Sequence, residues 1–338
     1  MVCPKASGAT MRRREFIKAV VLSLTAWPLA ARAQQPAMPV VGFIGITTPE
    51  DYAFRLAAFR EGLRDAGFIE GQNVNVEYRW ANDQLKLLPE AAADFVQRNV
   101  AVIVAGGGTP AAIAAKSATA TIPIVFAVAI DPVKAGFVAS LNKPGGNLTG
   151  VTNLNVEVTA KRLELVRELI PKATTVALLV NPKNPAVSGP FLKESQATAD
   201  ILGMHVRVLE ATTESDVDTV FARIAQSRVD ALIVMPDNFF SSRVKQLAAV
   251  ALSRRVPTIF HYRAFAASGG LVSHGSDEAE YYRQVGLQAG KILNGEKPAN
   301  LPVLQSTKVQ LVINLKTAKA LGITVPLPLL GRADEVIE

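Results

Sequence analysis

Residues 102–116 read VIVAGGGTPAAIAAK, an apolar run followed by three glycines, Thr-Pro and a segment of small residues. A short run of Val, Ile and Ala bounded by glycines is typical of a buried strand. Proline at the start of an alanine-rich segment indicates a helix that begins directly after the turn. A strand that enters a helix through a tight turn is the repeating unit of α/β folds, so this stretch predicts a sheet covered by helices.

The same alternation runs along most of the chain. Apolar strands are predicted at 40–46, 73–80, 101–105 and 122–129, and again at 175–180, 205–209, 230–235 and 257–260. Helical patterns separate them at 49–66, 85–98, 110–119, 156–170, 189–202, 215–227 and 240–253. Continuous Val, Ile and Leu strands alternating with helices indicate parallel sheets covered on both faces. Two such runs predict an α/β protein with two doubly wound, Rossmann-like lobes.

The alternation breaks at three places that are rich in Gly, Pro, Asn or Ser: LNKPGGNLTGVTN (141–153), AFAASGGLVSHGSDE (264–278) and GEKPANLPV (295–303). We expect the chain to cross between the lobes at these breaks, which makes a hinge of several strands. The first lobe is then 38–150 plus about 270–298, and the second is 151–269 plus about 300–338. A hinge between two α/β lobes predicts a cleft that can close.

The N-terminal segment has the pattern of an export signal. Residues 11–33 read MRRREFIKAVVLSLTAWPLAARA, a basic start, an apolar stretch and a small-residue end. The paired arginines resemble a twin-arginine signal. We expect 1–33 to be a signal peptide, cleaved near Ala33 on the way to the periplasm; the alternative is an N-terminal anchor helix. The only cysteine, Cys3, lies before that point, which argues against disulfides, thiol catalysis and cysteine-bound metal in the mature chain.

The net charge of +7 is concentrated in the same segment. Six of the Lys and Arg residues and a single Glu lie in 1–33, so the rest of the chain carries about +2. A nearly neutral body argues against a nucleic-acid partner.

Candidate ligand contacts follow from the rule that open α/β sheets bind ligands beyond the carboxyl ends of their strands. Several strands end in Thr or Asp followed by Pro, a helix-start signal. The candidates from the first lobe and the first crossing are Thr47, Thr48, Gly107, Gly108, Thr109, Pro110, Ala111, Asp131 and Asn153. Asp131 reads more simply as a plain helix cap. The candidates from the second lobe are Asn184, Asp237, Phe239 and Tyr262.

The turn at 106–111 favours an anion. Pro110 lacks an N–H, so Ala111 and Ala112 are predicted to be the first free donors, and a helix start attracts negative charge by about 0.3–1 kcal/mol. The turn lacks both the Gly-Lys-Ser/Thr ending of a P-loop and the G-x-G-x-x-G fingerprint. With no basic residue close in sequence, one carboxylate fits better than a polyphosphate. In the alternative interpretation, Thr109 only caps its own helix.

Asp237 is the best counter-charge for an ammonium group, and its alternative role is to cap helix 240–253. Phe239 and Phe240 wall the pocket or pack beneath it. Catalytic patterns are missing: His205, His261 and His274 lack metal spacing, and no G-x-S-x-G or H-E-x-x-H occurs. We therefore expect no enzyme, no metal and no cofactor. The run KRLELVRE (161–168) predicts an exposed helix face with alternating charges.

Long blocks of the chain resemble the substrate-binding proteins of ABC transporters, in particular the group described for tryptophan and tyrosine uptake. They include VIVAGGGTPAAIAAK, DPVKAGFVASLNKPGGNLTGVT and LVINLKTAKALGITVP, within a match over 40–338. The resemblance implies a type I periplasmic-binding-protein fold and partners in an inner-membrane permease and its ATPase. It also implies ligand contacts at Thr47, Thr48, Thr109–Ala111 and the turns around Asn184 and Asp237.

These observations predict an extracytoplasmic, monomeric solute-binding protein that captures a small carboxylate-bearing ligand, an amino acid or an aromatic acid, by cleft closure. Closure is driven by the preference of the ligand for the closed state. Two alternatives remain at this point: an exported binding protein that feeds a sensor, and an exported enzyme on the same fold. A transcription regulator of this fold would need a DNA-binding helix-turn-helix, and an export signal stands in its place.

Overall fold

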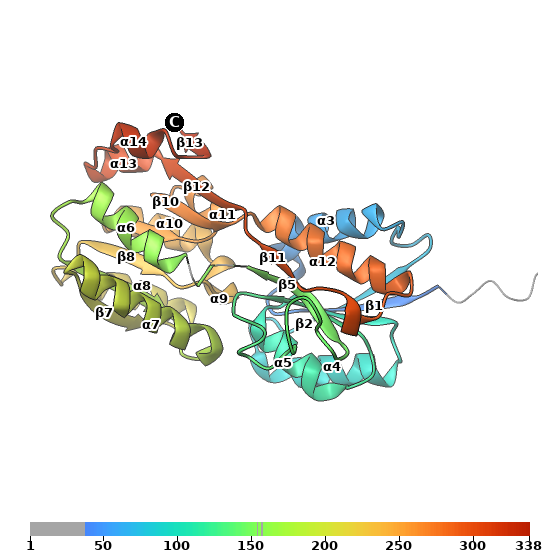
Figure 1. The fold of residues 1–338 in the computed structure, drawn as a ribbon. Coiled ribbons are helices and arrows are strands. Elements are labelled where there is room, and N and C mark those ends of the chain that lie inside the picture. The colour runs from blue at the N-terminus through green and yellow to red at the C-terminus, as the bar shows by residue number, and fades with distance from the viewer. Residues whose placement is uncertain (1–37, 154, 157) are drawn as a thin grey trace, which may run out of the picture. The chain divides into compact units, whose positions relative to one another are not determined.

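The computed structural model describes residues 38–338 with the exception of 154 and 157, so the expected signal peptide 1–33 lies outside the described residues. Residues Pro39–Glu338 form a compact unit that contains two β-sheets, each covered by helices (Figure 1). The α/β class predicted from the sequence is confirmed. None of the helices in the described part of the chain is long and apolar enough to cross a membrane.

The first sheet has the strand order β11-β5-β4-β3-β1-β2, and all its ladders are parallel. Its strands are β1 (Val40–Gly45), β2 (Asn75–Trp80), β3 (Val102–Ala105), β4 (Ile124–Val128), β5 (Leu148–Asn153) and β11 (Leu304–Ser306). Helices α3 (Pro49–Asp65) and α12 (Glu278–Leu293) cover one face, and α4 (Leu88–Gln97) and α5 (Thr109–Ala118) cover the other (Figure 1). Short 3-10 turns lie at Leu85–Leu87 and Pro298–Asn300.

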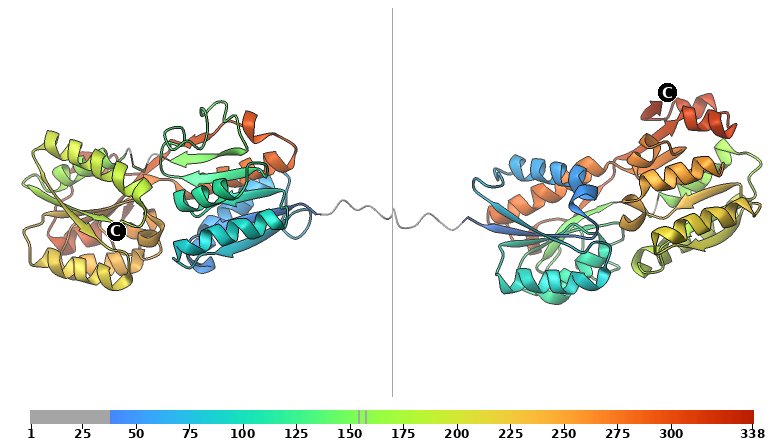
Figure 2. Two further views of the ribbon diagram at one scale, coloured as in Figure 1. Left: turned by 90° about the horizontal axis from the view of Figure 1, so that it is seen from below. Right: turned by 180° about the vertical axis from the view of Figure 1, so that it is seen from behind.

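The second sheet has the order β13-β12-β10-β9-β8-β6-β7. Its strands are β6 (Thr175–Val180), β7 (His205–Glu210), β8 (Ala231–Val234), β9 (Thr258–Phe260), β10 (Val272–Ser276), β12 (Val309–Asn314) and β13 (Glu335–Ile337). Only the β10–β12 pair among its ladders is antiparallel. The helices are α6 (Thr159–Leu169), α7 (Pro185–Leu202), α8 (Glu214–Ala225), α9 (Asn238–Ser241), α10 (Val244–Ser253), α11 (Arg263–Ala267), α13 (Leu315–Leu321) and α14 (Leu327–Leu330) (Figure 2).

The chain passes from one sheet to the other three times: after β5, between β10 and α12, and between β11 and β12. Three assignments differ from those expected. Residues 151–153 complete β5 of the first sheet, although the second lobe was expected to begin at 151. Strand β10 pairs with β9 and β12, so residues 272–276 belong to the second sheet and not to the first lobe. Strand β11 pairs with β5, so residues 304–306 belong to the first sheet. A break in the alternation marks a crossing, but it carries no information about which strand becomes the neighbour.

Helices α3 and α12 approach each other through glycine. A Cβ added at Gly62 would lie 1.8 Å from the Arg283 carbonyl oxygen, and one added at Gly286 would lie 2.0 Å from that of Phe59. Even an alanine at either position would force the two helix backbones apart. The close contact fixes the start of α12 beside the first two turns of α3.

The run 161–168 is not the exposed face that was expected. Arg162 is fully buried, and its Nε donates to the His274 carbonyl oxygen at 2.8 Å. Its Nη1 donates to the Asn155 carbonyl oxygen at 2.7 Å, so the side chain ties α6 to β10 and to the first crossing. Lys161 and Glu164 pair on the exposed side, as alternating charges predict. The prediction for Arg162 was wrong because a charged helix residue can be buried when backbone carbonyls accept from it.

Candidate functional site

A pocket lies where strands of both sheets end. The first sheet and its helices contribute Ile46, Arg55, Gly108, Thr109, Pro110, Ala127, Ala129, Glu278, Tyr281 and Tyr282. Asn153 is the last residue of β5 in the first sheet, and Asn155 lies in the crossing that follows it. Asn184, Val187, Pro236, Asp237, Asn238 and His261 come from the second lobe. The pocket is therefore built jointly by the two lobes.

The start of α5 forms one wall, and its geometry differs from the prediction in one respect. The N-cap is Gly108, with φ 78° and ψ −162°, and it provides no side-chain cap; Thr109 and Pro110 are the first two helical residues. The N–H of Ala112 donates to the Gly108 carbonyl at 3.1 Å. The N–H groups left without an intrahelical acceptor are those of Thr109 and Ala111, and not Ala112 as predicted.

The hydroxyl of Thr109 is the feature of this wall that indicates a ligand contact. The residue is 3% exposed and lines the pocket, and its Oγ1 has no hydrogen-bond partner among the described residues. A Thr that only capped its own helix would accept a backbone N–H. An unpaired buried hydroxyl costs free energy unless something else binds it.

Asp237 lies opposite and caps the short helix α9 instead of 240–253. Its Oδ1 accepts from the Phe239 N–H at 2.9 Å and from Asn181 Nδ2 at 3.1 Å. Its Oδ2 accepts from Asn184 Nδ2 at 2.8 Å. Burial raises the pKa of the Asp237 carboxyl, while the amide hydrogen bonds act in the opposite direction. The capping role is thus present, and the carboxylate also lines the pocket.

The remaining predicted residues fall into two groups. Gly108, Thr109, Pro110, Asn153, Asn184 and Asp237 meet in the pocket lining. Outside that lining are Thr47, Thr48, Gly107, Ala111, Asp131, Phe239 and Tyr262.

Several members of the second group have clear local roles. Thr48 caps α3 by accepting from the Asp51 N–H at 3.4 Å. Asp131 accepts from two N–H groups, at 2.9 and 3.1 Å, but the segment after it is a turn and not the expected helix. The Gly107 carbonyl accepts from Asn238 Nδ2 at 3.1 Å.

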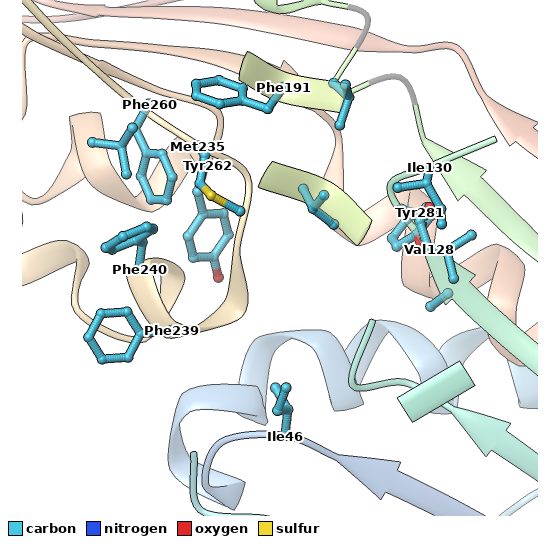
Figure 3. Close-up of a cluster of buried hydrophobic side chains, with 14 of the residues drawn as sticks. Ile46, Val128, Ile130, Phe191, Met235, Phe239, Phe240, Phe260, Tyr262 and Tyr281 are labelled. Carbon is cyan, nitrogen blue, oxygen red and sulfur yellow. Dashed lines mark hydrogen bonds between the residues drawn. The ribbon is translucent and has the colours of Figure 1, made fainter. Parts of the chain in front are cut away.

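Of the two phenylalanines after Asp237, one packs in the core and the other lines a pocket. Phe240 is fully buried in the core of the second lobe, as Figure 3 shows beside Phe260 and Tyr262. Phe239 lines a neighbouring chamber. That chamber shares Ile46, Pro110, Asn184 and Asp237 with the main pocket, so the two spaces adjoin.

Sequence reasoning missed seven polar or aromatic residues of the lining: Arg55, Asn155, Asn238, His261, Glu278, Tyr281 and Tyr282. Arg55, Glu278 and the two tyrosines lie on helices and not at strand ends. Asn155, Asn238 and His261 do follow shortly after strands β5, β8 and β9. One available signal was the apolar stripe of α3, because Arg55 falls next to Leu56 between Tyr52 and Phe59. A charged residue on a buried stripe indicates a buried partner or a ligand.

His261 is 5% exposed, and its Nδ1 lacks a hydrogen-bond partner in the described part of the chain. Burial, together with the positive charges of Arg162 and Arg55, holds the pKa of His261 well below its usual range. The imidazole is therefore neutral near pH 7, with one donor and one acceptor nitrogen.

Comparison with known proteins places the chain in a family. The model described as "ABC transporter substrate binding protein" matches residues 49–337. The chain belongs to this family. It is 30% identical over 275 residues to a tyrosine-binding protein of Clostridioides difficile, a match that covers 78% of this chain and 75% of the relative. The resemblance stated from the sequence is confirmed.

Several solved structures are similar to this chain. A conserved domain protein from Vibrio cholerae has a TM-score of 0.81 at 29% identity, covering 88% of this chain and 99% of that one. An ABC domain in complex with L-Trp from Streptococcus pneumonia has a TM-score of 0.80 at 26% identity, covering 89% of this chain and 100% of that one. The ligand-free, open structure of a substrate-binding protein from Clostridium difficile reaches 0.64 at 27% identity, covering 88% and 99%. The fold is the type I periplasmic-binding-protein fold, and the chain is a substrate-binding protein of the ABC transporter type.

Proposed function

We propose that this protein captures an aromatic α-amino acid between its two lobes and delivers it to an ABC permease. The observation that carries the proposal is the pairing of opposite poles across one pocket. The free start of α5 with the unpartnered Thr109 hydroxyl lies on one side, and the Asp237 carboxylate lies on the other. An α-amino acid presents the matching carboxylate and ammonium.

The carboxylate is assigned to α5. Thr109 lines the pocket, and its N–H lies at the N-terminus of α5, where the helix dipole favours negative charge. Hydrogen bonds to a charged group contribute about 1.5–3 kcal/mol each, more than those between neutral groups. The ammonium is assigned to Asp237, which keeps lone pairs beyond those used by its three neighbours.

The side chain is assigned to the adjoining chamber. Ile46 and Pro110 border both spaces, and Phe239 and Leu85 line the chamber and not the main pocket. These four apolar residues suit the faces of an aromatic side chain, while Asp83, Asn181, Lys183 and Thr212 make the rest of the chamber lining polar. The tyrosine-binding relative and the L-Trp complex support an aromatic ligand.

The mechanism is capture by cleft closure. Because residues of both lobes line the pocket, a bound ligand adds contacts to both and favours the arrangement in which they meet. The permease then receives the ligand from the closed protein, which acts as a monomer in the periplasm after cleavage near Ala33. Substrate-binding proteins of ABC transporters act outside the cytoplasm, which supports this location.

The test is calorimetry and thermal unfolding of the purified protein with L-Trp, L-Tyr, L-Phe, L-Leu and indole-3-acetate. A ligand at one hundred times its Kd is expected to stabilise the protein by about 2.7 kcal/mol. Asp237→Asn should weaken the binding of amino acids and leave that of an aromatic acid without an ammonium group nearly unchanged. Equal losses for both classes would refute the role of Asp237, and no stabilisation by any amino acid would refute the proposed ligand class.

A further inference from the structure

Arg55 is a buried cation at the edge of the pocket. It lies on α3 of the first lobe and is 3% exposed. Its Nε donates to Glu278 Oε2 at 2.7 Å, and both side chains are almost fully buried. Burying such a pair costs desolvation that the pair alone need not repay, so its remaining contacts are informative.

Three tyrosine rings surround the guanidinium. The Arg55 Cζ lies 5.0 Å from the ring centre of Tyr52, 5.1 Å from that of Tyr262 and 5.7 Å from that of Tyr282. These distances are within the range of cation–π attraction. The hydroxyls of Tyr52 and Tyr282 both donate to the Gly106 carbonyl, at 3.2 and 2.8 Å. The cage is thereby anchored to the turn that leads into α5.

Asn238 of the second lobe connects Arg55 to the same turn. Arg55 Nη1 donates to Asn238 Oδ1 at 3.3 Å, and Asn238 Nδ2 donates to the Gly107 carbonyl at 3.1 Å. The guanidinium therefore lies one side chain away from the start of α5. It also contacts the second lobe twice, through Asn238 and through the Tyr262 ring.

We propose that Arg55 is a ligand-binding residue that adds a charge-assisted hydrogen bond to the carboxylate held at α5 and joins the two lobes around it. This inference rests on the proposed function. Nε is held by Glu278 and Nη1 by Asn238, whereas Nη2 has no partner among the described residues while the side chain lines the pocket. The planar fork is thus fixed on two sides, and its third nitrogen is available to an anion.

Arg60, on the same helix, is the matched control for Arg55. Its Nε pairs with Glu70 at 2.5 Å, its Nη2 donates to the Tyr78 hydroxyl at 2.9 Å, and its Cζ lies 5.5 Å from the Tyr78 ring. All these partners belong to the first lobe, and Arg60 is not part of the pocket lining. The two arginines share carboxylate and tyrosine contacts, and only Arg55 reaches the second lobe and the pocket.

The experiment compares Arg55→Lys with Arg60→Lys by titration calorimetry with L-Tyr and L-Trp. Lysine keeps the charge for the acidic partner but lacks the fork. Arg55→Lys is expected to lower affinity by about 10- to 100-fold, the range of one charge-assisted hydrogen bond. Arg60→Lys should stay within about twofold of the unsubstituted protein, as expected for an exposed ion pair. Tyramine, which lacks the carboxylate, should lose no affinity through Arg55→Lys.

Closure is followed by small-angle scattering with and without ligand. The unsubstituted protein should become more compact on binding, and Asn238→Ala should reduce this change, because it removes the bridge while leaving the Arg55–Glu278 pair in place. If Arg55→Lys does not fold, Asn238→Ala is the variant that tests the role of Arg55. Unchanged affinity in Arg55→Lys, or unchanged affinity and compaction in Asn238→Ala, would overturn the role of Arg55. If the unsubstituted protein binds no amino acid, the proposed function fails instead.

Discussion

Gly108→Ala tests the geometry of the turn on which the carboxylate site depends. Gly108 has φ 78° and ψ −162°, a backbone conformation that is essentially restricted to glycine. Forcing another residue into it costs about 1–3 kcal/mol. The new Cβ would also lie 3.0 Å from Asn238 Nδ2, so the bond from Asn238 to the Gly107 carbonyl must lengthen or break. The loss of one neutral hydrogen bond is worth about 0.5–1.5 kcal/mol.

Two measurements separate these effects. Thermal unfolding should show a lower Tm, by about 2–4 °C for each kcal/mol lost. Calorimetry with L-Tyr should show an affinity lower by about 2- to 12-fold, if the hydrogen-bond loss falls on the closed state. Gly67→Ala is the control: its φ is +91° but no atom lies within 4 Å of the added Cβ. This variant should lower the Tm and leave the affinity unchanged.

Two outcomes would refute the reasoning. A Gly108→Ala protein with an unchanged Tm would mean that residue 108 does not have the left-handed conformation described above. An equal loss of affinity in the Gly67→Ala control would mean that binding responds to general destabilisation and not to the contact between residue 108 and Asn238.

Three further predictions concern other parts of the molecule. Asp83→Asn should weaken ligand binding by about 1.4- to 5-fold at low salt. The reason is that Asp83 Oδ2 of the first lobe pairs with Arg243 Nη2 of the second lobe at 2.9 Å. A double variant that exchanges the charges of residues 83 and 243 should restore the affinity. Burial lowers the pKa of His274 to about 4, so stability should fall by about 1.4 kcal/mol per pH unit as the pH drops from 6.5 toward 4, and unfolding of His274→Gln should show a smaller slope. Gly286→Ala should lower the free energy of unfolding by at least about 1–3 kcal/mol, whereas Gly331→Ala, whose nearest contact is 3.6 Å, should change it little; equal effects in urea titration would contradict the close helix contact.

The sequence predicted the architecture well because strand and helix patterns are local. The buried strands and the helices between them are close to their expected ranges, and all ladders of the first sheet are parallel. Strand partners are not local. The antiparallel insertion of β12 beside β10 and the edge position of β11 depend on where the returning chain finds a free edge. The residue pattern within a strand does not indicate which neighbour the strand will pair with.

The two Thr-Pro helix starts show how one neighbour changes a local prediction. In Thr48-Pro49 the threonine is the N-cap and its hydroxyl accepts from the Asp51 N–H. In Thr109-Pro110 the preceding glycine takes the cap position, and the threonine becomes the first helical residue. The hydroxyl then has no backbone donor to accept from, which frees it for the pocket. The dipeptide predicts a helix start in both cases, but the residue before it decides which position the threonine takes.

The missed residues that lie on helices share a physical cause. Strand ends gather at one edge of a sheet by topology, so Thr109, Asn184 and Asp237 could be anticipated. Arg55 instead depends on partners 183 and 223 residues away, Asn238 and Glu278. The apolar stripe of α3 indicates locally that Arg55 is buried, but no local pattern identifies partners at that separation.

What brings Glu278 to Arg55 is the glycine contact between α3 and α12. The backbones can approach because Gly62 and Gly286 carry no Cβ, and the approach sets the first turn of α12 against α3. Glu278 and Tyr282 lie one turn apart at the start of α12 and close two sides of the Arg55 cage. Since the cage holds the guanidinium at the pocket, a substitution that separates the helices should weaken ligand binding as well as the fold. Gly286→Ala should therefore lower the affinity for L-Tyr even at temperatures where the protein remains folded, and unchanged affinity would show that the cage does not depend on this helix contact.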